Sequence, residues 1–470
     1  MCKQQVKKVY YFNPQNDLAL ATGGINYVAP PFAMRMASDL AVLPAFIAPH
    51  GSLLITDSDL DAEWLDHLRA LLGIDVKAVK RHELRHLSNC RIMPWGWCLD
   101  MRRRLLKWGA SRDSVPSKEE IYHLRGLSHR RISVLMHLRL QELLNRQLCP
   151  TPVEIATTPE VMDFVARYRQ CFIKTPWSSS GRGIYHTTAG TTPELEQWCN
   201  GALKRQGSVL CEVALDKVMD LAVEFYCENG KAATRGYSVF ETDSHSQYHH
   251  SLVASSKVLK NKIEELYPEF DTVVNAVRQV LDELVAPHYT GWLGVDMLLF
   301  NNAQFTMHNA QSATNNAQSA TNNAQSATNN AQCTIHNAQC TIHNAQSATH
   351  NAQFTMHNAQ CTMSDLQAGE ASPHSPHGPH HNIVGINPCV ELNLRPTMGA
   401  ITSCLGDTIL PHGTTATFTI EQRGSTSQPW QELPEPVLEN KKLVAGALCL
   451  TTPSPTALYR AIVVVGSERN

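Results

Sequence analysis

The sequence lacks an excess of charge of either sign. Its 470 residues include 40 Lys and Arg and 42 Asp and Glu, which gives a formal net charge of −2. Proteins that hold nucleic acid or an anionic membrane surface through their overall charge carry a clear positive balance. The composition therefore predicts no nucleic-acid partner and no membrane partner, and any bound polyanion must be held by a local site.

Long hydrophobic runs and clustered cysteines are also missing. No run reaches the roughly 18 apolar residues that a membrane-spanning helix needs, and the segment up to Val9 has no apolar core of a secretory signal. The 14 cysteines form no Cys-x-x-Cys pair and no zinc-like cluster with histidine. We therefore expect a cytoplasmic protein in which most cysteines are small buried apolar residues.

Strand and helix signals alternate through the first part of the chain. Short strand-like segments occur at 9–12, 53–55 and 74–79, and a helical pattern lies at 60–72. Such alternation is typical of a parallel α/β unit, which we expect over residues 1–125.

A second region, over residues 126–300, combines helices with longer strands. It begins with a helical pattern at 128–148, which Pro150 and Pro152 end. The further elements expected are strands at 171–174, 184–187, 208–213, 221–227, 232–240 and 294–300, with helices at about 192–205 and 270–285.

A low-complexity insert then occupies residues 301–382. Its first part, 301–363, consists of nine near-identical copies of a seven-residue unit. A period of seven suggests a coiled coil, but the units lack a two-position apolar seam and contain Asn, which disfavours helices. We expect disordered or irregular structure, with a coiled coil and a stacked β-solenoid as the alternatives. Pro- and His-rich sequence at 372–381 predicts a flexible linker, with a divalent-metal site as the alternative.

Strand-like sequence resumes at Ile383. Residues 383–406 return to the second region, and a β-rich extension follows over 407–470. The insert thus separates two apolar strands. If they are neighbours in a hairpin, a long loop between them costs little. If the insert shifts the pairing of the two strands by one residue, the side chains of the shifted strand move to the opposite face of the sheet.

The segment from Lys174 to Gly183 is a candidate phosphate-binding loop. Its residues after the expected strand include Ser178, Ser179, Ser180, Gly181, Arg182 and Gly183. Backbone N–H groups of such a loop bind anions, and the glycines let the backbone approach a phosphate closely. Lys174 would reach the phosphates as a point charge. Because no helix follows directly, this is neither a Walker A loop nor a dinucleotide fingerprint. A Ser/Gly surface hairpin is the alternative.

Asp296, Glu391 and Asn393 are candidate metal ligands. Asp296 lies among apolar strand residues, where a buried carboxylate needs a partner or a cation. Glu391 and Asn393 occupy alternate strand positions, so their side chains share one face. Their oxygens are hard ligands suited to Mg²⁺ on nucleotide phosphates. Arg395 continues the same face and would neutralise a transferred phosphoryl group. The alternative is a solvated acidic edge strand.

Taken in this order, these elements resemble the ATP-grasp superfamily. The resemblance covers nearly all of the chain outside 301–382 and is greatest to ATP-grasp proteins of Bacteroidetes-type bacteria. The segments that carry it are 13–20, 94–97, 127–130, 176–183 and 391–395.

The resemblance implies an α+β and α/β architecture. An N-terminal pre-ATP-grasp domain (1–125) would precede a two-lobed ATP-grasp domain (126–300 and 383–406) with ATP between its lobes. Lys174 and the loop would contact the phosphates, and Glu212 the adenine and ribose. The implied Mg²⁺ ligands are Asp296, Glu391 and Asn393, and Arg395 would steady an acyl-phosphate. Arg130 or Arg131 stands where many relatives place a nucleotide-contacting Lys, which is a departure from the family pattern.

The implied activity is that of an ATP-dependent ligase that joins a small-molecule carboxylate to an amine. The γ-phosphate would activate the carboxylate as an acyl-phosphate, which the amine then attacks, so positioning and charge neutralisation matter more than a protein nucleophile. A nucleotide-binding protein without ligase activity is the alternative, because the insert follows the Asp296 strand directly. A small-molecule kinase would use the same site.

Two further features have two interpretations each. Glu224 would either face the site or be a surface strand carboxylate. The tryptophans of Pro94 to Trp97 would either present an aromatic wall to a substrate or fill the core.

Overall fold

The computed structural model describes residues 6–87, 89–178, 183–188, 190–243, 248–301 and 384–466. The predictions for the insert (301–382) and for Ser179, Ser180, Gly181 and Arg182 therefore lie outside the described residues, apart from Asn301.

The chain begins with a four-stranded parallel sheet in the order β3-β2-β1-β4. Its strands are β1 (Lys7–Tyr11), β2 (Ser52–Ile55), β3 (Val76–Val79) and β4 (Cys90–Pro94). The helices of this part are α1 (Asn16–Thr22), α2 (Pro31–Asp39), α3 (Asp59–Leu72) and α4 (Leu99–Trp108), with 3-10 turns η1 (Leu43–Phe46), η2 (Arg81–His86) and η3 (Arg112–Ser114). All of β2 is buried, as expected for a parallel strand covered on both faces. The predicted parallel α/β unit is confirmed.

A small antiparallel sheet follows two helices, α5 (Lys118–Leu127) and α6 (Arg131–Leu144). Its order is β5-β8-β6-β7. The strands are β5 (Val153–Ile155), β6 (Cys171–Lys174), β7 (Ile184–Thr187) and β8 (Val209–Val213). Helices α7 (Thr158–Tyr168) and α8 (Pro193–Gln206) pack on it through a shared core that includes Val161, Leu195 and Ile173.

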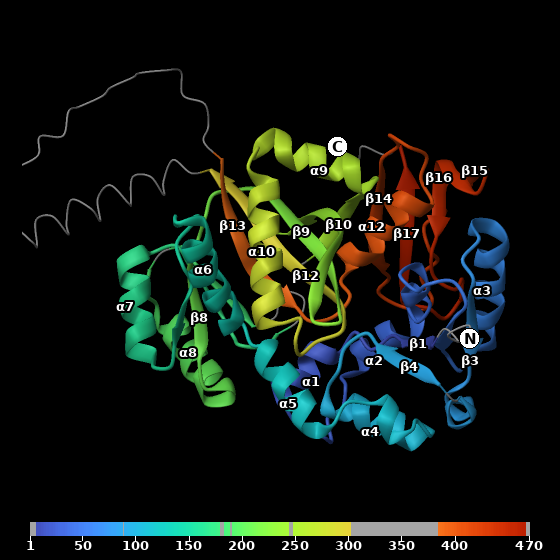
Figure 1. Cartoon of the computed structure of the whole chain (residues 1–470), viewed down its shortest axis with the longest axis horizontal. Helices are drawn as coiled ribbons and strands as arrows, with labels where there is room; N and C mark the ends of the chain where they lie inside the picture. Colours follow the sequence, from blue (N-terminus) through green and yellow to red (C-terminus); the bar gives the residue numbers. More distant parts are fainter. Residues whose placement is uncertain are drawn as a thin grey trace, which may run out of the picture. The chain divides into compact units, whose positions relative to one another are not determined.

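The largest sheet has nine strands in the order β13-β12-β9-β10-β11-β14-β17-β16-β15. They are β9 (Lys217–Glu228), β10 (Lys231–Thr242), β11 (Tyr248–Val253), β12 (Gly291–Asn301), β13 (Val384–Asn393), β14 (Ala416–Gln422), β15 (Val437–Glu439), β16 (Lys442–Cys449) and β17 (Tyr459–Val465). Figure 1 shows β13 beside β12 and the C-terminal strands continuing the sheet beyond β11. The mixed α/β class expected from the sequence is confirmed.

Alternate residues of β9 face opposite sides of this sheet. Leu221, Val223 and Phe225 belong to a core that contains residues of α10 (Phe270–Leu284) and α6. Ala222 and Glu224 point to the other side, as the two-residue period of a strand requires. The remaining helices are α9 (Ser256–Leu266) and α12 (Met398–Thr408), and α12 packs on β9, β10 and β11. A polar site can thus stand on one face while the opposite face forms the core.

The hairpin of β12 and β13 brackets the insert. Asn301 and Val384 are paired across this antiparallel ladder, and Asp296 pairs with Glu391 farther along it. The chain therefore leaves and re-enters the sheet at adjacent positions, and the register places the two acidic residues opposite each other.

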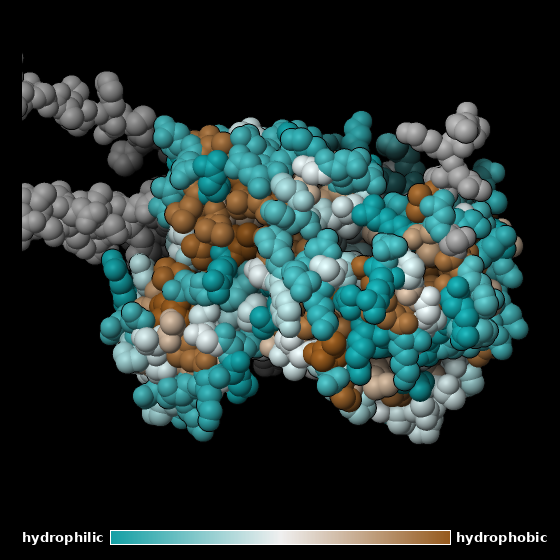
Figure 2. Space-filling view, turned by 60° about the horizontal axis from the view of Figure 1, so that its bottom comes forward, coloured by the Kyte–Doolittle hydropathy of each residue, from teal (hydrophilic) through white to brown (hydrophobic). Residues whose placement is uncertain are grey.

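Hydrophilic residues cover most of the face that Figure 2 shows, and hydrophobic residues gather there in separate patches. Of the described cysteines, all are free, and Cys98, Cys149 and Cys171 are among those that are buried. The described helices include none long and apolar enough to cross a membrane.

Candidate functional site

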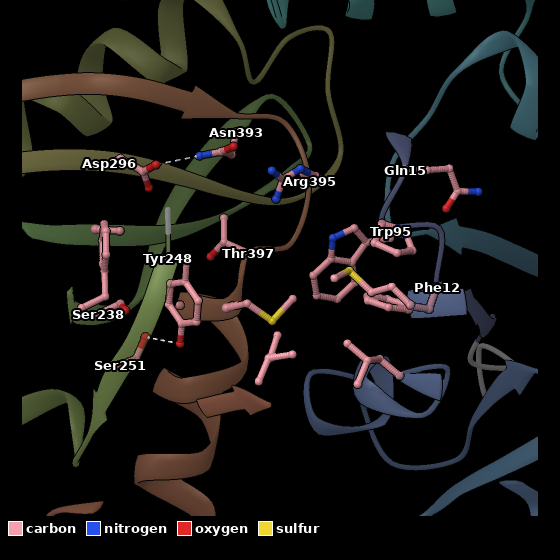
Figure 3. Close-up of a pocket in the computed structure, with 18 of the residues that line it drawn as sticks. Phe12, Gln15, Trp95, Ser238, Tyr248, Ser251, Asp296, Asn393, Arg395 and Thr397 are labelled. Carbon is pink, nitrogen blue, oxygen red and sulfur yellow. Dashed lines mark hydrogen bonds between the residues drawn. The ribbon is translucent and has the colours of Figure 1, made fainter. Parts of the chain in front are cut away.

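A cavity of about 460 Å³ lies against the face of the large sheet that carries Glu224. Its lining comes from the N-terminal part of the chain, with the loops after β1 and β4 and the helices α1 and α2, and from strands of the large sheet. The segment from β13 into α12 and Ser178 in the loop after β6 complete it. Figure 3 shows Asp296, Asn393 and Arg395 together at one part of it, with Phe12 and Trp95 on the other side. Of the predicted site residues, Ser178, Asp296, Glu391, Asn393 and Arg395 line this cavity.

The acidic pair results from the register of two neighbouring strands. Asp296 and Glu391 are cross-strand partners, and Asn393 Nδ2 donates a hydrogen bond of 3.1 Å to Asp296 Oδ2. Burial and the negative charge of Glu391 raise the pKa of Asp296 from 3.8 to about 7. A raised pKa of this origin indicates repulsion that a bound cation would relieve.

Arg130 connects the predicted phosphate loop to this acidic pair. Its Nη2 donates to both carboxylate oxygens of Glu391, at 2.9 and 3.0 Å. Its Nη1 donates to the carbonyl oxygen of Thr175 and to Ser178 Oγ, both at 2.7 Å. Burial alone would raise the pKa of Glu391, but the charge and hydrogen bonds of Arg130 outweigh it and lower that pKa. Glu391 therefore remains ionised under conditions where Asp296 titrates.

Lys174 and Glu212 lie together but outside the lining of the cavity. Lys174 Nζ donates to Glu212 Oε2 at 2.6 Å, and both side chains are buried. The second oxygen, Glu212 Oε1, is buried and has no hydrogen-bond partner in the part of the chain that the structure describes. Lys174 and Glu212, both expected around a nucleotide, are therefore adjacent. Their contacts with ATP remain a prediction.

The loop after β6 closes through its backbone. Thr175 N donates to the carbonyl oxygen of Gly183 at 2.8 Å. Gly183 has φ = +74°, and an added Cβ would lie 2.4 Å from Thr175 Oγ1, so this position requires glycine. The intervening Ser179 to Arg182 are not among the described residues.

Arg395 is fixed by a residue of the first helix. Its Nε and Nη2 donate to Asp17 Oδ2 at 2.9 and 2.7 Å. The guanidinium therefore keeps a defined place in the cavity wall beside Asp296 and Asn393 (Figure 3). Because Asp17 belongs to α1, the N-terminal part of the chain contributes directly to the site.

The structure decides between the two interpretations of Glu224 and of the tryptophans. Glu224 is fully buried and borders the cavity, and burial raises its pKa from 4.5 to about 8. Trp95 lines the cavity and packs edge-to-face on Phe12, with ring centroids 4.9 Å apart. Trp97 instead packs against the hydrophobic core. Trp95 is buried in a hydrophobic core and also borders the cavity, so it combines both roles, while Trp97 packs on the core alone.

No sequence pattern indicated the cavity residues on β10 and β11. Ser238 and Thr242 come from β10, and Tyr248 and Ser251 from β11, where Tyr248 Oη and Ser251 Oγ lie 2.9 Å apart. A hydroxyl on alternate strand positions is common on any solvated sheet face, so no local signal marks these residues. Only the pairing of β9, β10 and β11 brings them to the acidic residues.

The sequence matches no family model and no curated protein. Several solved structures are similar to the whole chain. Biotin carboxylase from Campylobacter jejuni, in complex with β-γ-ATP, has 10% identity and a TM-score of 0.47 over 98% of this chain and 88% of its own. N5-carboxyaminoimidazole synthetase from Staphylococcus aureus has 8% identity and a TM-score of 0.41 over 98% and 93%.

A third similarity covers part of the chain. D-alanyl-alanine synthetase A from Vibrio cholerae O1 biovar eltor has 15% identity and a TM-score of 0.32 over 53% of this chain and 84% of its own. With TM-scores below 0.5, none of the three carries an argument about function, which has to come from the site itself.

Proposed function

We propose that the chain is an ATP-dependent carboxylate–amine ligase of the ATP-grasp superfamily, acting through an acyl-phosphate. The observation that carries this proposal is the placement of Asp296 and Glu391 opposite each other at a cavity, with Asn393 bonded to Asp296. Arg130 and Arg395 flank the acidic residues and supply the positive charge that phosphoryl transfer needs.

The donor set fits Mg²⁺. Two carboxylates and the amide oxygen of Asn393 are hard oxygen ligands. Burial and the charge of Glu391 outweigh the nearby Arg395 and raise the pKa of Asp296, so a bound cation would stabilise its ionised form. Asp296, Glu391 and Asn393 would hold the ion, which when bound would neutralise charge on the nucleotide phosphates.

The charged residues beside this set would bind and orient ATP. Arg130 keeps the Ser178 end of the loop against Glu391, so a phosphate held by the loop stays close to the acidic residues. Lys174, at the end of β6, carries the cation expected at the phosphates. Contact of Lys174 with a phosphate replaces part of its interaction with Glu212.

The reaction has two balanced steps. A carboxylate oxygen of the first substrate attacks the γ-phosphorus, and ADP leaves with the electrons of the broken P–O bond. The amine nitrogen then attacks the acyl carbon, phosphate leaves, and the amine loses a proton. Arg395, fixed by Asp17, would hold the carboxylate and then the acyl-phosphate. Orientation and charge neutralisation supply the rate enhancement, so no cysteine or serine nucleophile is invoked.

The strand register bears on the alternative of a nucleotide-binding protein without ligase activity. The motivation for that alternative was that the insert could displace Asp296 from Glu391, whereas the two residues are paired, which supports the ligase. A small-molecule kinase would share the first step and differ only in the acceptor.

A trapping experiment tests the proposal. Purified protein is incubated with ATP, Mg²⁺ and panels of carboxylates, with hydroxylamine in place of the amine. We expect carboxylate-dependent ADP release together with a hydroxamate, because hydroxylamine captures an acyl-phosphate. ADP release with a stable phosphorylated alcohol would identify a kinase, and ATP binding without any release would support the non-catalytic alternative.

A further inference from the structure

The side chains on the cavity face of the large sheet change in character from one edge toward the other. Glu391, Asp296 and Glu224 stand on β13, β12 and β9. Ser238 stands on the next strand, β10. Farther along, the wall consists largely of aromatic and aliphatic side chains, which include Phe240, Tyr248, Ile420 and Tyr459. The cavity therefore has an acidic end and a mainly apolar end.

Two buried polar atoms at the acidic end lack partners. Glu224 is 0% exposed and Ser238 is 1% exposed. Glu224 Oε1 accepts a 2.7 Å hydrogen bond from Thr397 Oγ1, but Glu224 Oε2 and Ser238 Oγ have no hydrogen-bond partner within the described ranges. Unpaired buried polar atoms destabilise a fold by about 1 to 3 kcal/mol each. The two side chains occupy diagonal positions of the neighbouring strands β9 and β10 and both lie against Gly399, which indicates a site for a hydrogen-bond donor.

The backbone around Glu224 is shaped for its carboxylate. Gly294, the cross-strand partner of Glu224 on β12, would place a Cβ 3.1 Å from Glu224 Oε2. At Gly399, in the first turn of α12, a Cβ would lie 2.2 Å from Glu224 Oε1. Any larger residue at either position would crowd the carboxyl group.

Charge then selects the class of donor. In the proposed function Asp296 and Glu391 are committed to Mg²⁺, and Arg395 is already paired with Asp17. Glu224 is the remaining carboxylate of the cavity lining, and within the described part of the chain no Lys, Arg or His forms a hydrogen bond or ion pair with it. Above its pKa of about 8, where Glu224 is ionised, a cationic donor satisfies it better than a neutral one, because a hydrogen bond between charged groups is roughly twice as strong.

We infer that Glu224 Oε2 and Ser238 Oγ receive the amino group of the second substrate, and that this substrate is a primary amine with an aromatic or bulky apolar group. The inference rests on the proposed function and specifies its amine. The apolar group would lie along the wall formed by Phe240, Tyr248 and Ile420. From β9, which carries Glu224, to β14 there are three strand spacings of about 4.8 Å, so a substrate roughly 14 Å long fits along this face.

Binding of simple probes to the full chain tests this inference without nucleotide. The probes are 2-phenylethylamine and 2-phenylethanol, which differ in the amino group. Their affinities are measured by calorimetry at about pH 9, above the pKa of Glu224 and below that of an alkyl ammonium group. We expect the amine to bind at least about tenfold more tightly than the alcohol. In Glu224→Gln this preference should disappear while the affinity for the alcohol is kept, since Gln retains an acceptor for Thr397 Oγ1.

Two serine variants provide the matched comparison. Ser238→Ala should reduce the amine preference by about threefold or more. Ser251→Ala, an equally buried hydroxyl of the same cavity that is paired with Tyr248, should leave it unchanged. If Glu224→Gln does not fold, the serine pair alone decides. Equal binding of the two probes to the wild type, no binding of either, or an unchanged preference in Ser238→Ala would overturn the inference.

The result is separable from the proposed function. If the protein prefers the amine but shows no Mg²⁺-dependent ATP binding, the amine site is retained and the ligase proposal is rejected. If the protein turns over ATP but shows no preference for the amine, the ligase proposal is retained and the amine site is rejected.

Discussion

Replacing Asp296 by Asn should stabilise the protein, and more strongly at high pH than at low pH. The folded protein holds a proton on Asp296 up to about pH 7, because burial and the charge of Glu391 raise its pKa from 3.8. The unfolded chain releases this proton near pH 4. Stability is therefore fully present below the unfolded pKa and is lost as the pH rises through the folded pKa. The Asn side chain cannot ionise and avoids that loss.

The size of the effect follows from the shift. One pKa unit corresponds to 1.36 kcal/mol, so a shift of about three units corresponds to about 4 kcal/mol at pH 8. About two units of this pKa shift lie between pH 5 and the folded pKa, so the stability lost over that pH range is at most about 3 kcal/mol. The Asp296 side chain borders the cavity, where water screens part of the repulsion. We therefore expect the gain from Asp296→Asn to be about 1 to 3 kcal/mol larger at pH 8 than at pH 5.

Urea unfolding of wild type and variant at the two pH values measures this difference. The control is Glu421→Gln, which removes a carboxylate of the same sheet that pairs with Arg460 at 2.7 Å and should give no gain at either pH. Mg²⁺ at pH 8 should raise the wild-type midpoint and leave that of Asp296→Asn nearly unchanged. A gain that is equal at both pH values, or a greater loss at pH 8, would refute the argument that burial and the charge of Glu391 make ionised Asp296 unfavourable in the folded protein.

Two further predictions concern the loop and the insert. Lys174→Ala should weaken ATP–Mg²⁺ binding at least about tenfold. It should also lower Tm, because Glu212 then loses its buried partner. Unchanged ATP affinity of this variant in calorimetry would exclude Lys174 from the site. Replacing residues 302–383 by an Asn-Gly turn should change Tm by no more than about 3 °C and keep the ATP-induced rise, because Asn301 and Val384 are already cross-strand partners. A fall of many degrees would mean that the insert supports the fold.

Local patterns were enough to predict most elements of the fold. The strands at 171–174 and 184–187 were expected at the positions of β6 and β7, and the apolar periodicity at 270–285 corresponds to α10. The hairpin of β12 and β13 was one of the two expectations for the strands beside the insert. The order of the other strands could not be predicted, because β14 pairs with β11 and with β17 through contacts distant in sequence. Such pairing depends on long-range packing, which single-sequence patterns do not contain.

The candidate site was only partly visible in the sequence for the same reason. Asp296, Glu391 and Asn393 stood out because acids within apolar strands are rare. Arg130 was noticed as a departure from a family pattern, and its two-sided contact with Ser178 and Glu391 required the structure. The roles of Asp17 as a partner of Arg395 and of Ser238 beside Glu224 depend on tertiary contacts alone.

Calorimetric titration of ATP with and without Mg²⁺ tests the central claim most directly, on wild type, Glu391→Gln and the Glu421→Gln control. We predict that Mg²⁺ tightens ATP binding at least about tenfold in wild type and in the control. Glu391→Gln should stay folded, because Gln can still accept a hydrogen bond from Arg130, but it should lose the Mg²⁺ dependence and release no ADP. ATP affinity that is independent of Mg²⁺ in the wild type, or Mg²⁺-dependent turnover that survives in Glu391→Gln, would contradict the account.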